Sequence, residues 1–222
     1  MSANSNTSLL NSPNLLTKES GSSASLGRPR AFDLEIALQK ALEVFWQKGF
    51  EGASLPDLTL AMGINKPSLY AAFGNKEQLF LKALERYENR PGAYFYPSLL
   101  APTAYQVAER ILLGAAAEHG DPLHPTGCLM VQAALACSDS GQSVKDALIA
   151  RRKAGGEKLV ARFEQAKLSG DLPADADPHA LAGFIITVLQ GLSVQATNGA
   201  DAAQLQTIAR TALRAFPVAS AD

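Results

Sequence analysis

Two short segments near the front of the chain each carry a full set of helix start and stop signals, with only a tight turn between them. Ser54 opens the first segment, and Gly63 ends it after about two turns. Asn65 opens the second, which has Pro67 in its first turn and ends at Gly74. Two helices joined this closely must turn sharply against one another. The spacing therefore predicts a helix-turn-helix that presents its second helix outward.

The rest of the chain shows helical periodicity, and no run of alternating apolar and polar residues indicates a strand. A 222-residue chain that is 47% hydrophobic can bury a sizeable core. We therefore expect an all-α protein. Gly155 and Gly156 lie inside one expected helix and indicate a kink, a hinge or a close helix crossing. The further helices are expected at 34–48, 76–90, 103–118, 127–137, 142–167, 178–198 and 202–216.

Composition excludes several classes of protein. Two cysteines make no disulfide framework, so we expect a cytoplasmic protein in a reducing compartment. The longest uncharged apolar run, 180–189, is half of the roughly 20 residues that a membrane helix needs, so no membrane segment is expected. The net charge of −1 argues against indiscriminate coating of phosphates but allows a local positive face. Residues 1–26, rich in Ser and Asn, are expected to form a disordered tail.

The outward side chains of the second short helix suit the major groove of DNA. Lys66 can donate to guanine, and Ser68 to a base or a phosphate. The helix N-termini at Ser54 and at Lys76 offer amides for flanking phosphates. A solvated surface is the alternative for each of these residues, and Pro67 can simply start its helix. The candidate DNA contacts are Arg28 and Arg30 on a flexible lead, Ser54, Lys66, Pro67, Ser68, Tyr70 and Lys76.

Residues 28–84 resemble the N-terminal domain of the TetR family of bacterial transcriptional regulators. Apolar anchors at Ile64, Leu69 and Phe73 fit that pattern, whereas Ala71 and Ala72 are smaller than the side chains of many members. The resemblance is carried by Gly49-Phe50, Ser54-Leu55-Pro56-Asp57-Leu58, Ala61-Met62-Gly63-Ile64, Asn65-Lys66-Pro67-Ser68-Leu69-Tyr70-Ala71-Ala72-Phe73 and Asn75-Lys76-Glu77-Gln78-Leu79.

The resemblance implies a DNA-binding regulator, by default a repressor, with a DNA-binding domain at 27–80. It also implies a helical domain at 81–217 that binds an unknown small-molecule effector and forms a homodimer. In this family the last two helices of each subunit usually build the dimer, which here means Pro178–Asn198 and Ala202–Phe216. The stretch 181–194 is apolar nearly all round, as a helix against a core or another subunit must be. A two-fold dimer predicts double-stranded DNA with a palindromic operator.

Within the implied effector domain, several side chains are candidates to line an apolar pocket, with core packing as the alternative for each. Cys128 could instead sense oxidants, or bind a metal with His119 and His124, although a buried inert thiol is commoner. Cys137 is nine residues further and on the opposite side of a continuous helix. We expect no metal and no cofactor. The pocket candidates are Tyr94, Phe95, Tyr96, Cys128, Met130, Phe163, Phe184 and Gln190.

Two other classes of function remain as alternatives. An all-α enzyme is disfavoured, because the chain has no Gly-x-Ser-x-Gly, no phosphate-binding glycine loop, no His-Glu-x-x-His and only three histidines. An all-α protein-interaction module would use the helix-turn-helix for protein contact, and it would bind DNA neither tightly nor with a salt-dependent affinity.

Overall fold

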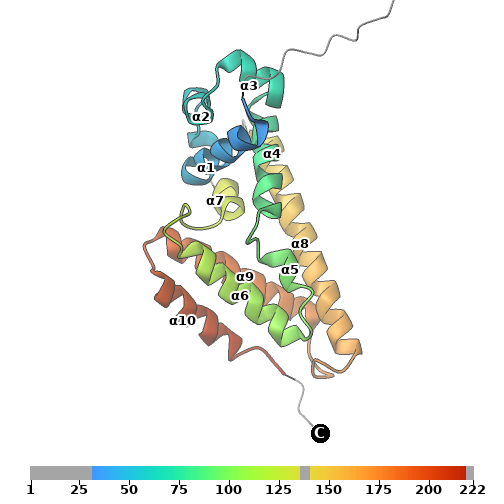
Figure 1. Cartoon of the computed structure of the whole chain (residues 1–222). Helices are drawn as coiled ribbons and strands as arrows, with labels where there is room; N and C mark the ends of the chain where they lie inside the picture. The colour runs from blue at the N-terminus through green and yellow to red at the C-terminus, as the bar shows by residue number, and fades with distance from the viewer. Residues whose placement is uncertain (1–31, 136–140, 219–222) are drawn as a thin grey trace, which may run out of the picture. The chain divides into compact units, whose positions relative to one another are not determined.

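In a computed structural model, residues 32–135 and 141–218 are described, and over these residues the chain forms ten helices and no strand (Figure 1). The all-α class is therefore confirmed. Three residues discussed above, Arg28, Arg30 and Cys137, lie outside the described part. The helices are α1 (Leu34–Gly52), α2 (Leu55–Met62), α3 (Lys66–Phe73), α4 (Lys76–Asn89), α5 (Phe95–Ser98), α6 (Ala104–His119), α7 (Leu129–Leu135), α8 (Gln142–Leu168), α9 (Pro178–Thr197) and α10 (Ala202–Leu213).

The first four helices begin where the sequence predicts, because the residue before each helix caps it. In α2, the Ser54 hydroxyl accepts from the Asp57 amide while the Asp57 carboxylate accepts from the Ser54 amide. The Asn65 side chain caps α3 through the Ser68 amide at 2.9 Å. Gly63 ends α2 in the left-handed conformation, with φ 65°, which favours glycine. The turn between α2 and α3 is thus fixed by local chemistry.

The described residues form two apolar cores. The core of the N-terminal region, residues 32–89, joins α1 to α4, and Phe45 meets Phe80 edge-on with ring centroids 5.0 Å apart. The core of the C-terminal region, residues 95–216, joins α6, α9 and α10, which lie side by side in Figure 1, to the second half of α8. Helix α8 contributes Leu148 to the first core and Leu159 to the second. The two regions are therefore packed along one continuous helix.

Several expectations for the C-terminal region need adjustment. The helix expected at 127–137 begins only at Leu129, the last helix ends at Leu213, and the short α5 was not expected. Helix α8 continues without a break through Gly155 and Gly156, so of the three alternatives the structure favours a close approach between helices. A Cβ on Gly156 would lie 3.2 Å from Ile186 Cδ1 of α9.

Helix α9 is apolar but only partly covered. By length and composition alone it could span a membrane, a test that the core helix of a globular protein also passes. The sequence-based expectation of no membrane segment considered only the apolar run 180–189, whereas the whole helix has 20 residues. Ile185 and Leu192 are buried, whereas Phe184 and Val194 are 36% and 39% exposed. The all-round burial expected for 181–194 is therefore not reached within one chain.

Candidate nucleic-acid interface and ligand cavity

Helix α3 has one buried and one exposed face. Leu69 and Phe73 anchor it to the core and are 0% and 4% exposed, while Lys66 and Pro67 are exposed at its start. Tyr70 is 43% exposed, and the Lys66 ammonium lies 5.8 Å from the centre of its ring. The exposed face thus carries a cation and a phenol hydroxyl on a rigid helix. Such a face can enter a major groove.

Ser54 and Ser68 are partly engaged in holding the helices together. The Ser54 hydroxyl also donates to Asp57 at 2.7 Å, and the Lys48 ammonium lies 2.8 Å from the same carboxylate. The Lys48 and Ser54 hydrogen bonds lower the pKa of Asp57 to about 2. The Ser68 amide is used by the cap of α3. A phosphate at Ser54 would therefore add to, or compete with, the bonds of the capping box.

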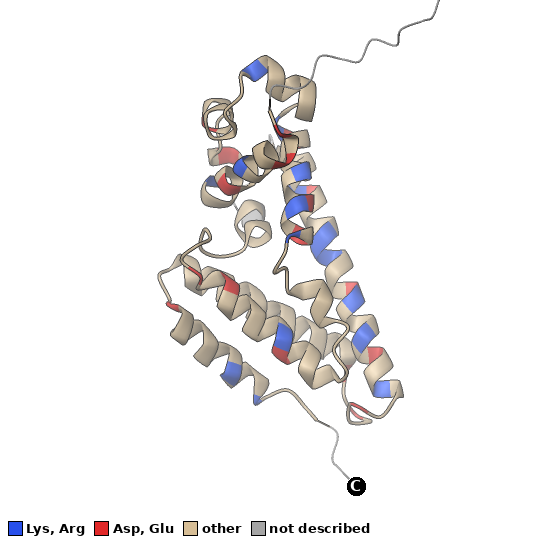
Figure 2. Cartoon of the chain, viewed as in Figure 1, with Lys and Arg blue, Asp and Glu red and all other residues tan. Residues whose placement is uncertain are grey.

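Lys76 lies against the end of α1. Its ammonium is 3.5 Å from the Glu51 carbonyl oxygen and 4.6 Å from the centre of the Phe50 ring. Burial lowers its pKa below the usual value. Sequence reasoning missed this contact, and it also missed Lys82, whose ammonium lies 3.4 Å from the Ala72 carbonyl oxygen at the end of α3. Figure 2 shows Lys and Arg positions along α4 and α8 as well as on α3.

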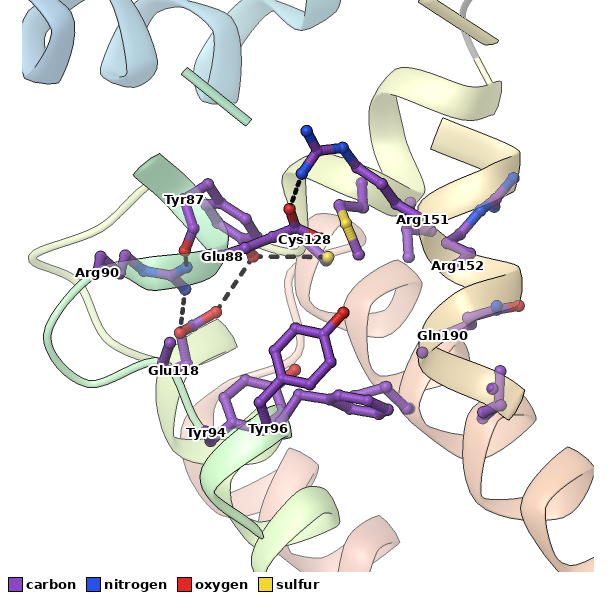
Figure 3. Close-up of a pocket in the computed structure, with 18 residues that line it drawn as sticks. Tyr87, Glu88, Arg90, Tyr94, Tyr96, Glu118, Cys128, Arg151, Arg152 and Gln190 are labelled. Atoms are coloured by element: carbon purple, nitrogen blue, oxygen red, sulfur yellow. Dashed lines mark hydrogen bonds and ion pairs between the residues drawn. The ribbon is translucent and has the colours of Figure 1, made fainter. Parts of the chain in front are cut away.

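A cavity between the end of α4 and helices α5 to α9 is lined by most of the predicted pocket residues (Figure 3). Its empty space is about 820 Å³, including its open mouth. Gly114 of α6 makes room beside it, because a Cβ there would lie 2.8 Å from Tyr94 Cβ. The predicted residues that line the cavity are Tyr94, Phe95, Tyr96, Cys128, Met130 and Gln190.

Two predicted pocket residues lie elsewhere. Phe163 is fully buried in the C-terminal core, where its ring centroid is 5.4 Å from that of Phe216. Phe184 points outward on α9 and is 36% exposed. Neither lines the cavity, because helical spacing alone does not tell which side of a buried helix faces an internal space.

One wall of the cavity is a polar cluster of three side chains. Arg90 and Glu118 form an ion pair, and the Tyr87 hydroxyl donates to Glu118 at 3.2 Å. The Arg90 guanidinium stacks 3.8 Å from the centre of the Tyr87 ring. Burial raises the pKa of Glu118, although the Arg90 pairing opposes this rise. A second ion pair at the cavity joins Arg151 of α8 to Glu88 of α4.

The chemistry around Cys128 favours neither redox sensing nor metal binding. Burial raises the pKa of its thiol, so little of the reactive thiolate forms near neutral pH. Burial also lowers the pKa of His119 to about 4 and keeps this imidazole neutral. His124 stacks on Trp46 with ring centroids 5.7 Å apart. Residues 32–135 and 141–218 hold no group of three or more His, Cys, Asp or Glu side chains placed to bind a metal ion.

The peptide group between Gly127 and Cys128 is hydrogen-bonded to both α1 and α9. The Trp46 indole of α1 donates to the Gly127 carbonyl oxygen at 2.9 Å, and the Cys128 amide donates to the Ser193 hydroxyl of α9 at 2.7 Å. Gly127 has φ 78°, and a Cβ there would lie 2.4 Å from Gln132 Nε2. We call Trp46, Gly127, Cys128 and Ser193 the junction. The sequence suggests only a core role for Trp46, because a bond across 81 positions leaves no local pattern.

Comparisons with known proteins agree with this architecture. Residues 37–83 match the family model "Bacterial regulatory proteins, tetR family", and residues 110–212 match "Tetracyclin repressor-like, C-terminal domain". The chain is 34% identical over 201 residues to the HTH-type transcriptional repressor ComR of Escherichia coli K12, covering 87% of this chain and 93% of ComR. It is also 51% identical over 61 residues to the repressor BdcR of the same organism, 28% of this chain and 31% of BdcR.

A solved structure resembles the whole described fold. A cysteine mutant of the TetR family transcriptional regulator CifR, complexed with 26-bp double-strand operator DNA, shares 45% sequence identity with this chain at a TM-score of 0.81. The match covers 86% of this chain and 100% of CifR.

Proposed function

Since the chain belongs to the TetR family and is a DNA-binding transcriptional regulator rather than an enzyme, we propose that it acts as a homodimeric, ligand-responsive repressor of a palindromic operator. The exposed face of α3, held by the buried Leu69 and Phe73, is the observation that carries this proposal. The DNA-binding domain would occupy 27–80, and the effector and dimerisation domain 81–217. The protein would work in the cytoplasm.

Base reading is assigned to the first turns of α3. Lys66 and Ser68 would face base edges or phosphates, and Tyr70 would reach a phosphate through its hydroxyl. Pro67 would pack against the sugar-phosphate backbone, while Ser54 and Lys76 would contact the phosphates on either side. Arg28 and Arg30 lie outside the described residues, and their proposed contacts rest on the sequence alone.

Dimerisation is assigned to α9 and α10. Apolar side chains on their outward faces, Phe184, Val194 and Ile208, are 36%, 39% and 39% exposed in the single chain. The outward stripe of α9 also carries Ala180 and Gly191, whose small size allows a second helix to approach closely. Covering this stripe with its symmetry copy would bury apolar surface and form a four-helix bundle.

The effector response is assigned to the junction. Cys128 lines the cavity, its amide is bound to α9, and the adjacent carbonyl is bound to Trp46 of the DNA-binding domain. A ligand that displaces Cys128 would therefore shift α1, which is bound through Trp46, relative to α9 of the proposed dimer interface. The operator would be released only to the extent that the ligand prefers the splayed form of the dimer.

Repression is favoured over activation by the relatives. ComR and BdcR are both named transcriptional repressors, and CifR is seen on operator DNA. A repressor needs only to occupy its operator, so the described helix-turn-helix is sufficient for that role.

The proposal is tested by measuring how tightly the protein binds operator fragments that have been selected from the source genome. Lys66→Ala should weaken operator affinity about tenfold and lower the salt dependence of log K by about one. Lys153→Ala is the matched control, because it removes the same charge from an exposed position on α8. Equal affinity and equal salt dependence for Lys66→Ala and the parent protein would remove Lys66 from the interface.

The dimer is tested by sedimentation. Phe184→Glu should convert dimers to monomers, since it places a charge in the proposed apolar contact. Leu123→Glu, at a loop position that is 86% exposed, is the matched control and should remain dimeric. A dimer that survives Phe184→Glu would disprove the assigned interface.

A further inference from the structure

We propose that the ligand of the cavity is a small, uncharged and mostly apolar molecule with one hydrogen-bond acceptor, which accepts a hydrogen bond from the Tyr96 hydroxyl. The inference rests on the effector role proposed above and adds the chemical class of the effector. It follows from three features of the cavity: its apolar walls, its paired charges and its unused hydroxyl donors.

Most of the cavity surface is apolar. Phe95, Met130, Ile186 and Leu189 line it from α5, α7 and α9. Gly155 and Gly156 of α8 line another side of the cavity. A Cβ on Gly155 would lie 3.4 Å from Phe95 Cε1. Any larger residue at these positions would take up the space between α8 and the facing walls. A ligand here gains its affinity mainly by burying apolar surface.

Four of the five charged side chains that line the cavity are already paired with one another. Glu118 is paired with Arg90, and Glu88 is paired with Arg151. The remaining cation, Arg152, extends from α8 away from the tyrosines in Figure 3. A charged ligand that lies among the tyrosines would therefore stay unpaired among apolar groups or break an existing ion pair. Both options carry a large desolvation cost.

Two tyrosine hydroxyls are free to recognise a polar atom. Within the described residues, the hydroxyls of Tyr94 and Tyr96 have no hydrogen-bond partner, whereas that of Tyr87 is engaged with Glu118 and Cys128. Figure 3 shows the Tyr96 hydroxyl pointing into the space between Cys128 and Gln190. Burial raises the pKa of both Tyr94 and Tyr96, so the hydroxyls remain protonated donors. A protonated donor selects an acceptor such as a carbonyl or ether oxygen.

The test uses four probes of nearly equal size and shape: acetophenone, cumene, benzoate and benzamidinium. They differ only in carrying a neutral acceptor, no polar atom, a negative charge or a positive charge. Titration calorimetry of the full chain should show the tightest binding for acetophenone. Cumene should bind about tenfold more weakly, because it leaves the hydroxyl without an acceptor. Benzoate and benzamidinium should bind more weakly still.

Tyr96→Phe identifies the donor. The variant should bind acetophenone about as weakly as the parent protein binds cumene, and its affinity for cumene should change little. Tyr105→Phe on α6 is the matched control, because Tyr105 lies outside the cavity and contacts Phe216 instead. Thermal unfolding of both variants shows whether they fold. Equal loss of acetophenone and cumene binding in Tyr96→Phe would overturn the assigned hydrogen bond.

The outcomes separate the ligand class from the effector role. If acetophenone binds best but the operator stays bound, the ligand class stands and the effector role fails. If benzoate or benzamidinium binds best and releases the operator, the effector role stands and the uncharged class is overturned. If none of the four probes binds, the inference is overturned, whereas operator binding by the protein is judged separately.

Discussion

The N-terminal and C-terminal regions are both helical, but different interactions specify them. In the N-terminal region the helix starts are set by residues three positions apart, as in the Ser54–Asp57 and Asn75–Gln78 capping boxes. The C-terminal region has a similar box at Asp201–Gln204, but its cavity also depends on bonds between distant segments, such as Cys128 to Ser193 across 65 positions. Local signals therefore determine the DNA-binding face, whereas the cavity exists only after the whole chain has packed.

The largest expected effect tests the packing of the locally specified region. Leu69→Ala should lower the free energy of unfolding by about 3–4 kcal/mol, because Leu69 is 0% exposed and its loss leaves a cavity under α3. Urea denaturation measures the change. Leu60→Ala on α2 is the matched control; Leu60 is 84% exposed, so the expected change is below about 0.5 kcal/mol. Similar losses in both variants would mean that α3 is not anchored as described.

Acid should weaken the C-terminal region through His119. Its pKa is about 4 when folded against 6.5 for the free side chain, so between these values the unfolded state binds more protons. The free energy of unfolding should therefore fall as the pH drops from about 6.5 to 4, by up to about 3 kcal/mol.

Substitution isolates this contribution. His119→Leu should flatten the pH dependence of stability, whereas His179→Leu, at an exposed position, should keep the acid sensitivity of the parent. Urea denaturation at several pH values is the measurement. A parent-like pH dependence in His119→Leu would contradict the assignment.

Ser193→Ala tests the junction that joins the two regions. It leaves the Cys128 amide without its acceptor, which should cost about 1–2 kcal/mol of stability. Ser169→Ala is the control, because its hydroxyl donates to Ala166 at the exposed end of α8. The effect of ligand on operator affinity should also shrink in Ser193→Ala. An unchanged ligand effect would place the coupling elsewhere.

The smallest effect concerns a single cap. Asn65→Ala removes the side chain that accepts from the Ser68 amide and should cost about 1 kcal/mol. Asn65→Asp keeps an acceptor and should remain close to the parent in urea denaturation. If both variants lose the same stability, the cap is not what starts α3.

The difference between the regions also explains which predictions could be made from sequence. The helix-turn-helix follows from Ser54, Gly63 and Asn65, whose signals act within one turn. The prediction of Phe163 and Phe184 as pocket residues is wrong, because their apolar side chains and helical spacing do not show which neighbours cover them. The roles of Arg90 and Ser193 depend on segments that meet only in the folded chain, so no local pattern could indicate them.

The central claim is that a dimer presents two α3 helices one turn of DNA apart. A spin label at exposed position 60 on α2, introduced as Leu60→Cys with Cys128→Ser and Cys137→Ser, reports this spacing by pulsed electron resonance without occupying the groove face of α3. With operator bound, we expect one narrow distance that corresponds to α3 helices about 34–36 Å apart. A cavity ligand should shift or broaden it. No intermolecular distance, or a spacing with operator that cannot match successive major grooves, would contradict the account.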